Sequence, residues 1–222
     1  MLSHQLRERF TALGHFYELP QGRRCRSVLE LLSHERAAER TDAERGLPDA
    51  VVVMMNPGSS RPLGEDGWAG RLPSIRPKRL VPAQPDTTQY QVMRVMARMG
   101  WEHARIINLS DLHEPKSSAF VRDYPAWGNV AHSIFMPTRR AELASELQRQ
   151  DGAPVVLAWG VHPRLKPLVE MALEPLHAAG RCCGVQRQGA YLHPLPRSQA
   201  EKLAWVDALC EQLLNPTPIL AN

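Results

Sequence analysis

The feature that most constrains the fold is a set of short apolar runs separated by longer segments with helical periodicity. The runs occupy residues 50–55, 104–109, 154–159 and 190–193. Continuous apolar runs of this length are typical of strands buried on both faces, and strands that alternate with helices form right-handed βαβ units. The sequence therefore predicts an α/β fold: three-layer α/β/α with a central, mainly parallel four-stranded sheet.

The helices expected between these strands have recognisable ends. Asp86 is suited to an N-cap and Gly100 to the end of the same helix. Ser198 and Glu201 have the spacing of a capping box, and Pro137 suits a first helical turn. We therefore expect helices at about residues 87–99, 137–150, 163–179 and 198–214.

The N-terminal segment differs in composition from the rest of the chain. Residues 1–48 are polar and rich in Arg and Glu, with only short apolar patches. This composition favours helices that cover another layer. The sequence thus predicts an N-terminal helical extension at residues 1–48, packed on a main domain at residues 49–222.

Charge and cysteine content limit the functional classes. The net charge of +4 and the sequence pI of about 9.1 are compatible with nucleic-acid binding. No apolar run approaches the roughly 18 residues of a membrane helix, and the N-terminus has no apolar signal-peptide core. Cys25, Cys182, Cys183 and Cys210 form no C-x-x-C pair, so free thiols are expected rather than a zinc or iron–sulfur site. We expect a monomeric cytoplasmic protein.

Three polar residues follow the predicted strands. Asn56, Asn108 and His193 each come at the carboxyl end of a buried run. In open α/β sheets, ligands bind at the edge formed by these ends. The candidate site is therefore this edge.

The residues at this edge resemble the motifs of the uracil-DNA glycosylase superfamily. MNPG at residues 55–58 resembles the first motif of its single-strand-selective and mismatch-specific branches, and HPLPR at residues 193–197 resembles the second. Asn108 lies where that superfamily has its base-reading Asn, and AWG at residues 158–160 resembles another of its strand ends. The same layout occurs in related uncharacterised bacterial families. The resemblance extends from about residue 50 to 210.

This resemblance implies a monofunctional DNA glycosylase that flips a pyrimidine and hydrolyses its N-glycosidic bond, leaving an abasic site. Asn56 would position the water, and His193 would donate a hydrogen bond to the base as negative charge develops. Asn108 would read the base edge, and Met55 and Pro57 would line the base pocket. No metal or organic cofactor is implied.

Four further positions bear on substrate and DNA. Arg197 lies where the superfamily has its wedge residue, and Leu195 replaces a Ser that contacts phosphate. Ser198 either substitutes for that Ser or only caps its helix. Gly58 replaces the Tyr of the uracil-specific branch, which would admit modified or mismatched pyrimidines with a C5 substituent. Alternatively, Gly58 serves only the backbone of the turn.

A long loop at residues 61–85 is rich in Pro, Gly and Arg. We expect its Trp68 to stack on a base and its cations to follow a phosphate backbone, although a solvated lid is an equal alternative. The cations are Arg61, Arg71, Arg76, Lys78 and Arg79. The spacing of His103, Asp111 and His113 favours surface residues over a metal site.

Two other functions remain open on this fold. One is an N-glycosidase that acts on a free nucleoside or nucleotide, which would not need the basic loop. The other is a non-catalytic nucleic-acid sensor. For a glycosylase, the biological setting is either DNA repair or antiviral defence against phage with modified DNA.

Overall fold

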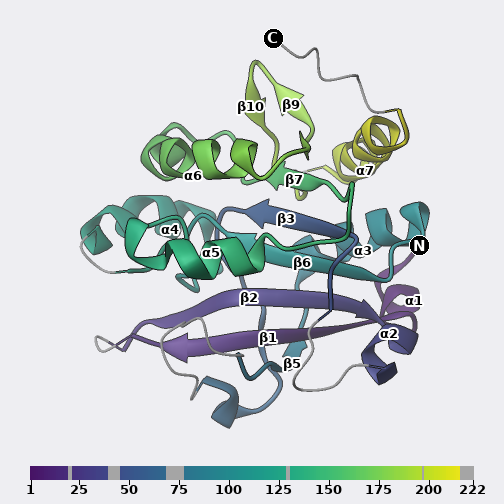
Figure 1. Cartoon of the computed structure of the whole chain (residues 1–222), viewed down its shortest axis with the longest axis horizontal. Coiled ribbons are helices and arrows are strands. Elements are labelled where there is room, and N and C mark those ends of the chain that lie inside the picture. Colours follow the sequence, from purple (N-terminus) through teal and green to yellow (C-terminus); the bar gives the residue numbers. More distant parts are fainter. Residues whose placement is uncertain (20–21, 40–45, 69–77, 129–130, 197, 216–222) are drawn as a thin grey trace.

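A computed structural model of the protein describes residues 1–19, 22–39, 46–68, 78–128, 131–196 and 198–215. The chain forms a mixed α/β structure around one eight-stranded sheet, with strand order β4-β5-β1-β2-β6-β3-β7-β8 (Figure 1). Its strands are β1 (Phe10–Glu18), β2 (Arg24–Ser33), β3 (Ala50–Met54), β4 (Arg61–Pro62), β5 (Val81–Gln84), β6 (His103–Asn108), β7 (Val155–Ala158) and β8 (Cys182–Cys183). The α/β class expected from the sequence is confirmed.

One half of the sheet is parallel. Strands β6, β3, β7 and β8 are neighbours and all run in the same direction. In this register, Met54 of β3 lies between Asn108 of β6 and Ala158 of β7. The carboxyl ends of these three strands therefore meet at one edge of the sheet, as the apolar runs predicted.

A strand does form within residues 190–193, but the prediction that it is the fourth strand of the parallel sheet is wrong. Ala190–Tyr191 forms β10, which pairs only with β9 (Gln186–Arg187) in a separate two-stranded hairpin. The fourth parallel strand is β8 instead, and it pairs with β7 through two residues. A strand this short leaves no periodic pattern in the sequence, because periodicity needs several residues to appear.

The prediction that residues 1–48 are mainly helical is also wrong. Strands β1 and β2 form an antiparallel hairpin, and β2 pairs with β6, so this segment extends the sheet instead of covering it (Figure 1). Only the short helices α1 (Ser3–Arg7) and α2 (His34–Glu39) flank the hairpin. The polar composition was misleading because Arg26, Ser27 and Glu30 are buried within β2.

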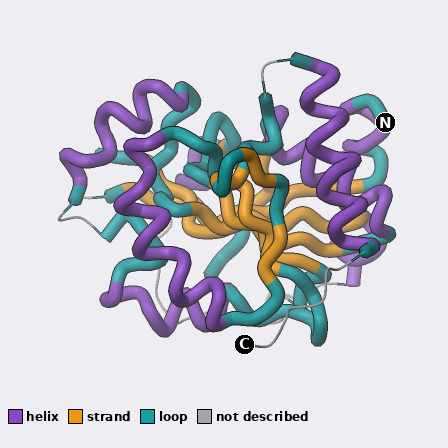
Figure 2. The backbone as a smooth tube through the Cα atoms, turned by 90° about the horizontal axis from the view of Figure 1, so that it is seen from above, coloured by secondary structure: helices purple, strands orange, loops and turns teal. Residues whose placement is uncertain are grey.

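Two hydrophobic clusters lie on opposite faces of the sheet, with helices gathered on both sides of the strands (Figure 2). The α3 face carries Met54 and Ile106 and packs against α3 and α7. The α5 face carries Val53 and Ile107 and packs against α4, α5 and α6. Successive residues of a strand point to opposite faces, so a strand position decides which face a side chain joins.

The helix ends largely follow the sequence. Asp86 caps α3 by accepting hydrogen bonds from two backbone N–H groups, and Gly100 ends this helix at φ +70°. Ser198 and Glu201 form the expected capping box of α7. The segment at 137–150 is shorter than predicted, because a 3₁₀ turn precedes α5 and the helix ends at residue 146.

The remaining bounds are α3 (Thr87–Met99), α4 (Ser117–Asp123), α5 (Arg140–Glu146), α6 (Lys166–Ala178), α7 (Gln199–Leu214), and 3₁₀ helices Glu65–Trp68, Tyr124–Trp127, Pro137–Arg139 and Pro163–Leu165. Within the described ranges, no helix has the length and apolar character needed to cross a membrane.

Candidate functional site

The carboxyl edge of the parallel strands brings two of the expected site residues to neighbouring segments. The backbone N–H of Leu109 donates to Met54 O at 2.8 Å, which holds the end of β6 against β3. The side-chain Nδ2 of Asn56 donates to the backbone oxygens of Leu112 at 3.2 Å and Glu114 at 2.8 Å. Asn56 therefore lies against the loop that follows Asn108.

The bonds of Asn56 orient its amide group. Both bonds use Nδ2, so the amide plane is fixed and Oδ1 is left as an acceptor. The side chain is largely buried at the sheet edge, with 8% exposed. An amide oxygen held in this way can orient a water molecule but cannot take its proton as a carboxylate would. Met55, the preceding residue, packs into the core of the α5 face.

Asn108 has the most unusual environment of the expected residues. Its side chain is completely buried, and neither Nδ2 nor Oδ1 has a hydrogen-bond partner among the described residues. Leaving a buried polar group unpaired costs about 1–3 kcal/mol, so such groups are rare in native proteins. By strand alternation from Ile106, Asn108 points to the α3 face. An amide with a free donor and a free acceptor is suited to a ligand edge that presents both.

His193 follows the small hairpin and lies beside the end of β7. A Cβ atom built on Gly160 would lie 3.5 Å from the Cβ of His193, and Gly160 N donates to Tyr191 O at 3.1 Å. The backbone N–H of Leu195 donates to Nδ1 of His193 at 3.2 Å. In the neutral ring the proton is therefore on Nε2, which is free to donate.

The charge state of His193 agrees with this arrangement. Burial lowers its pKa to about 4, and the nearby Asp86 carboxylate acts in the opposite direction without reversing the effect. The imidazole is accordingly neutral at pH 7. A neutral donor can stabilise negative charge that develops on a bound group without itself being consumed as an acid.

The turn after β3 is tied to the start of α3. Gly58 has φ +67°, and a Cβ atom on it would lie 2.5 Å from Oδ2 of Asp86. This oxygen also accepts from the backbone N–H of Ser59 at 3.1 Å. Gly58 is therefore explained by the turn, and Asp86 occupies the space beside it. The described residues do not support the expectation that this glycine opens room for a C5 substituent.

Three residues that the sequence analysis did not single out for this site adjoin the turn. Arg26 is fully buried in β2, and its Nη1 donates to Pro57 O at 3.4 Å. Within the described part of the chain, its Nε and Nη2 atoms have no partner, and neither do Oγ of Ser60 and Nε2 of His113. A charged residue inside a buried strand is a sequence signal for a buried polar role, but this segment was predicted to be a polar helical extension, so the signal was missed.

Trp68 is buried rather than available as a stacking platform. Its side chain is 9% exposed, and its ring centroid lies 5.2 Å from that of Phe16 and 5.3 Å from that of His113. The guanidinium carbon of Arg24 lies 4.8 Å from the centroid of the same ring. Trp68 therefore forms one wall of the region around His113, with its stacking surface already engaged.

The expected DNA-contacting residues have different environments. Lys78 is not a surface cation: it is buried and pairs with Glu142 at 2.6 Å and Glu146 at 2.7 Å. That prediction is wrong, because the two carboxylates come from α5, far away in sequence. Arg79 and Arg61 are exposed, and Arg61 donates to Gln84 Oε1 at 3.3 Å.

Ser198 is exposed, but its hydroxyl is engaged in the cap of α7. Its Oγ donates to Glu201 Oε2 at 2.8 Å and accepts from Glu201 N at 3.1 Å. Three further candidate cations, Arg71, Arg76 and Arg197, lie outside the described residues.

Two polar residues expected at the surface, His103 and Asp111, are buried on the α5 side. His103 Nε2 lies 2.6 Å from Glu30 Oε2. Asp111 Oδ2 accepts from Tyr17 at 2.8 Å and from Arg139 at 2.7 Å. These contacts belong to a buried ion-pair network that joins the sheet to α5. Within the described ranges, the four cysteines are free thiols and no cluster of three or more His, Cys, Asp or Glu is arranged to hold a metal.

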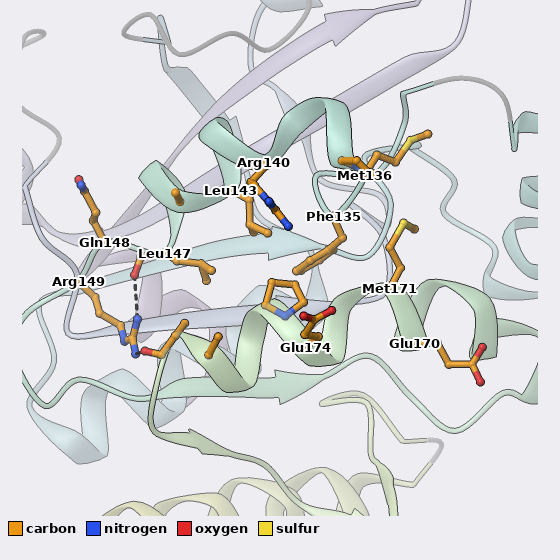
Figure 3. A pocket seen from close by; sticks show the side chains of 15 residues that line it. Phe135, Met136, Arg140, Leu143, Leu147, Gln148, Arg149, Glu170, Met171 and Glu174 are labelled. Atoms are coloured by element: carbon orange, nitrogen blue, oxygen red, sulfur yellow. Dashed lines mark hydrogen bonds between the residues drawn. The ribbon is translucent and has the colours of Figure 1, made fainter.

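A separate open pocket of about 770 Å³ lies between α5 and α6 (Figure 3). Its lining is mainly apolar, with Phe135, Leu143 and Met171 facing the space between the helices. None of the residues proposed from the sequence lines it. Its place between two helices, away from the polar residues at the carboxyl edge, separates it from the candidate site.

Comparison with known proteins identifies the family but no relative of known activity. No curated protein and no solved structure matches the chain. One family model matches residues 36–195, a span that includes Asn56, Asn108 and His193 but excludes strands β1 and β2. That family is described as protein of unknown function (DUF1643), and this chain belongs to it.

Proposed function

We propose that the protein is a monofunctional DNA glycosylase that hydrolyses the N-glycosidic bond of a flipped pyrimidine. The observation that carries the proposal is the buried, unpartnered amide of Asn108, at the same sheet edge as Asn56 and His193. Such an amide is suited to the edge of a pyrimidine, which presents donors and acceptors side by side. The resemblance of the segments 55–58 and 193–197 to glycosylase motifs supports the same reaction.

Each residue has a defined task in this proposal. Cleavage passes through an oxocarbenium-like sugar while negative charge moves onto the departing base. Nε2–H of His193 donates to that charge, and Oδ1 of Asn56 orients the attacking water. Because Asn56 is no base, the water attacks once the sugar is already strongly cationic. The reaction needs no metal or organic cofactor.

The proposal also has structural and cellular parts. We infer that β6, β3, β7 and β8, with helices on both faces, form a three-layer α/β/α catalytic core of the glycosylase type. DNA would approach the carboxyl edge of these strands, where exposed Arg61 and Arg79 and the cap at Ser198 are the described candidates for phosphate contacts. We expect a monomer that acts in the cytoplasm.

A base-release assay tests the reaction. The DNA panel contains uracil, thymine mispaired with guanine, 5-hydroxymethyluracil, and hydroxymethylated or glucosylated cytosine, and abasic sites are detected by alkaline cleavage. We expect release of at least one base, and a fall in kcat of about 10²–10³-fold in His193→Ala, since one oriented donor is lost. Asn108→Ala should weaken release of the same base.

The control is Gln150→Ala, which truncates an exposed amide in the segment after α5 that donates to Leu47 O. It should leave base release unchanged. Absence of release from every member of the panel would overturn the proposal. Release that persists in an Asn56→Ala, His193→Ala double variant would overturn the assigned site, even if the activity itself is real.

A further inference from the structure

We propose that Arg26 and Ser60 form an oxyanion-binding site next to the Asn56 turn, which takes a carboxylate or phosphate group of the ligand read by Asn108. The pairing with Asn108 rests on the proposed function. Oxyanion binding itself does not depend on the glycosylase reaction.

The guanidinium of Arg26 has the required free edge. The side chain is fully buried, and its one described hydrogen bond is the 3.4 Å contact from Nη1 to Pro57 O. The two other donor atoms, Nε and Nη2, have no partner among the residues that the structure describes. These atoms form the side-on edge of the guanidinium, whose two parallel N–H groups match the two oxygens of a carboxylate or phosphate.

The nearest counter-charges do not fill this edge. Asp86 and Asp111 both attract Arg26 electrostatically, while burial lowers its pKa to about 10. Asp86, however, uses Oδ2 for the backbone N–H of Ser59 and Oδ1 for that of Thr88. Asp111 uses Oδ2 for Tyr17 and Arg139. Neither carboxylate hydrogen-bonds Arg26, so its Nε and Nη2 remain available to a ligand.

Ser60 and His113 belong to the same group of side chains with buried polar atoms as Arg26. Ser60 is completely buried, and its Oγ has no partner among the described residues. His113 is linked to the backbone of Ser60, and its pKa is lowered first by burial and then by the charge of Arg26. His113 is therefore uncharged at neutral pH. Its unpartnered Nε2 can accept a hydrogen bond from a hydroxyl or acid proton of the same ligand.

The topology places this group beside Asn108. Arg26 pairs in register with Phe16, which belongs to the α3 face, so both side chains lie on that face. Asn108 points to the same face from β6, which is the neighbour of β2. A single ligand can therefore present a flat hydrogen-bonding edge to Asn108 and an oxyanion to Arg26. Arg26 lies outside residues 36–195, so the N-terminal hairpin supplies this part of the site.

Isothermal titration calorimetry with two matched ligand pairs tests the proposal. The first pair is deoxyuridine 5′-monophosphate and deoxyuridine, which tests a nucleotide phosphate. The second is 5-carboxyuracil and thymine, which tests a carboxylate on the base. We expect the anionic member of at least one pair to bind at least tenfold more tightly than its neutral partner. The pair that shows this preference identifies the source of the oxyanion.

Variants decide whether Arg26 causes the preference. Arg26→Lys keeps the charge but loses the side-on pair of donors, so it should reduce the preference several-fold, and Ser60→Ala should reduce it by a smaller factor. Arg7→Lys, at an exposed position of α1, is the matched control and should retain the preference. Thermal unfolding without ligand checks that each variant is folded. If Arg26→Lys does not fold, the anion preference measured for Ser60→Ala tests the site instead.

The proposal is overturned if neither anion is preferred, or if the preference survives in folded Arg26→Lys and in Ser60→Ala. Because binding is measured without base release, oxyanion binding by a protein that releases no base would uphold this site while rejecting the glycosylase. Base release without any anion preference would reject the oxyanion site while upholding the glycosylase.

Discussion

At the scale of single residues, the turn after β3 shows how one glycine can be required for two separate reasons. Gly58 has a left-handed backbone with φ +67°, which disfavours any side chain. In addition, Oδ2 of Asp86 lies 2.5 Å from the place that a Cβ atom would take. A side chain here would displace Asp86 from the N-cap of α3 and from Ser59.

Gly58→Ala should therefore destabilise the protein by about 1–3 kcal/mol, which combines backbone strain with loss of part of a helix cap. Urea unfolding measures this cost. Gly100→Ala is the matched control, since Gly100 has φ +70° with no atom within 4 Å of a built Cβ. We expect the control to cost only the backbone part, about 1 kcal/mol. Equal costs in the two variants would show that the contact with Asp86 has no energetic effect.

At the scale of elements, the basic loop at residues 61–85 is anchored to α5 by the buried charge of Lys78. Lys78 pairs with Glu142 and Glu146, and Arg139 pairs with Glu142 through Nε at 2.7 Å. Arg105 of β6 donates to Glu30 of β2 at 2.9 Å, which continues the network across the sheet. Paired buried charges contribute little net stability, but removal of one partner is costly because the other charge is left uncompensated.

Lys78→Met should consequently lower the free energy of unfolding by about 3–5 kcal/mol, because two buried carboxylates each lose one of their cations. Arg79→Met, one residue further and exposed, should change it by no more than about 0.5 kcal/mol. Chemical denaturation of both variants makes the comparison. A Lys78→Met protein as stable as Arg79→Met would contradict the anchoring role.

At the scale of the whole molecule, neutral buried histidines link stability to pH. Burial lowers the pKa of His132 to about 4, and its Nδ1 lies 2.9 Å from Oγ of Ser110. The unfolded chain takes up a proton on this residue near pH 6.5, whereas the folded protein does so only near pH 4. The unfolded state therefore binds more protons between these values, and stability falls as the pH falls.

His132 alone should remove up to about 3 kcal/mol of the free energy of unfolding between about pH 6.5 and pH 4, at about 1.4 kcal/mol per pH unit. Urea unfolding at several pH values measures the slope. His132→Asn should have a shallower slope over this range, whatever constant offset it carries from its lost hydrogen bond. His177→Gln changes an exposed histidine and should keep the original slope. Parallel profiles for His132→Asn and the unchanged protein would refute the assignment.

The sequence by itself determined the features that depend on near neighbours along the chain. The runs at residues 50–55, 104–109 and 154–159 predicted β3, β6 and β7, because strands buried on both faces are mainly apolar. The caps at Asp86 and Ser198 were predicted because capping is a contact over three residues. The placement of Asn56 and Asn108 at one edge followed from the parallel order of their strands.

Only the tertiary structure decided the features that depend on distant partners. Residues 10–33 form a hairpin of the sheet, although their charges indicated an exposed helical segment. Lys78 is buried against α5 and Arg26 beside Pro57, and no local pattern shows which cation will meet a carboxylate or a carbonyl from elsewhere in the chain. The free energy of a buried charge is set by the partners that the fold brings to it, and these partners are fixed only once the strands and helices have packed.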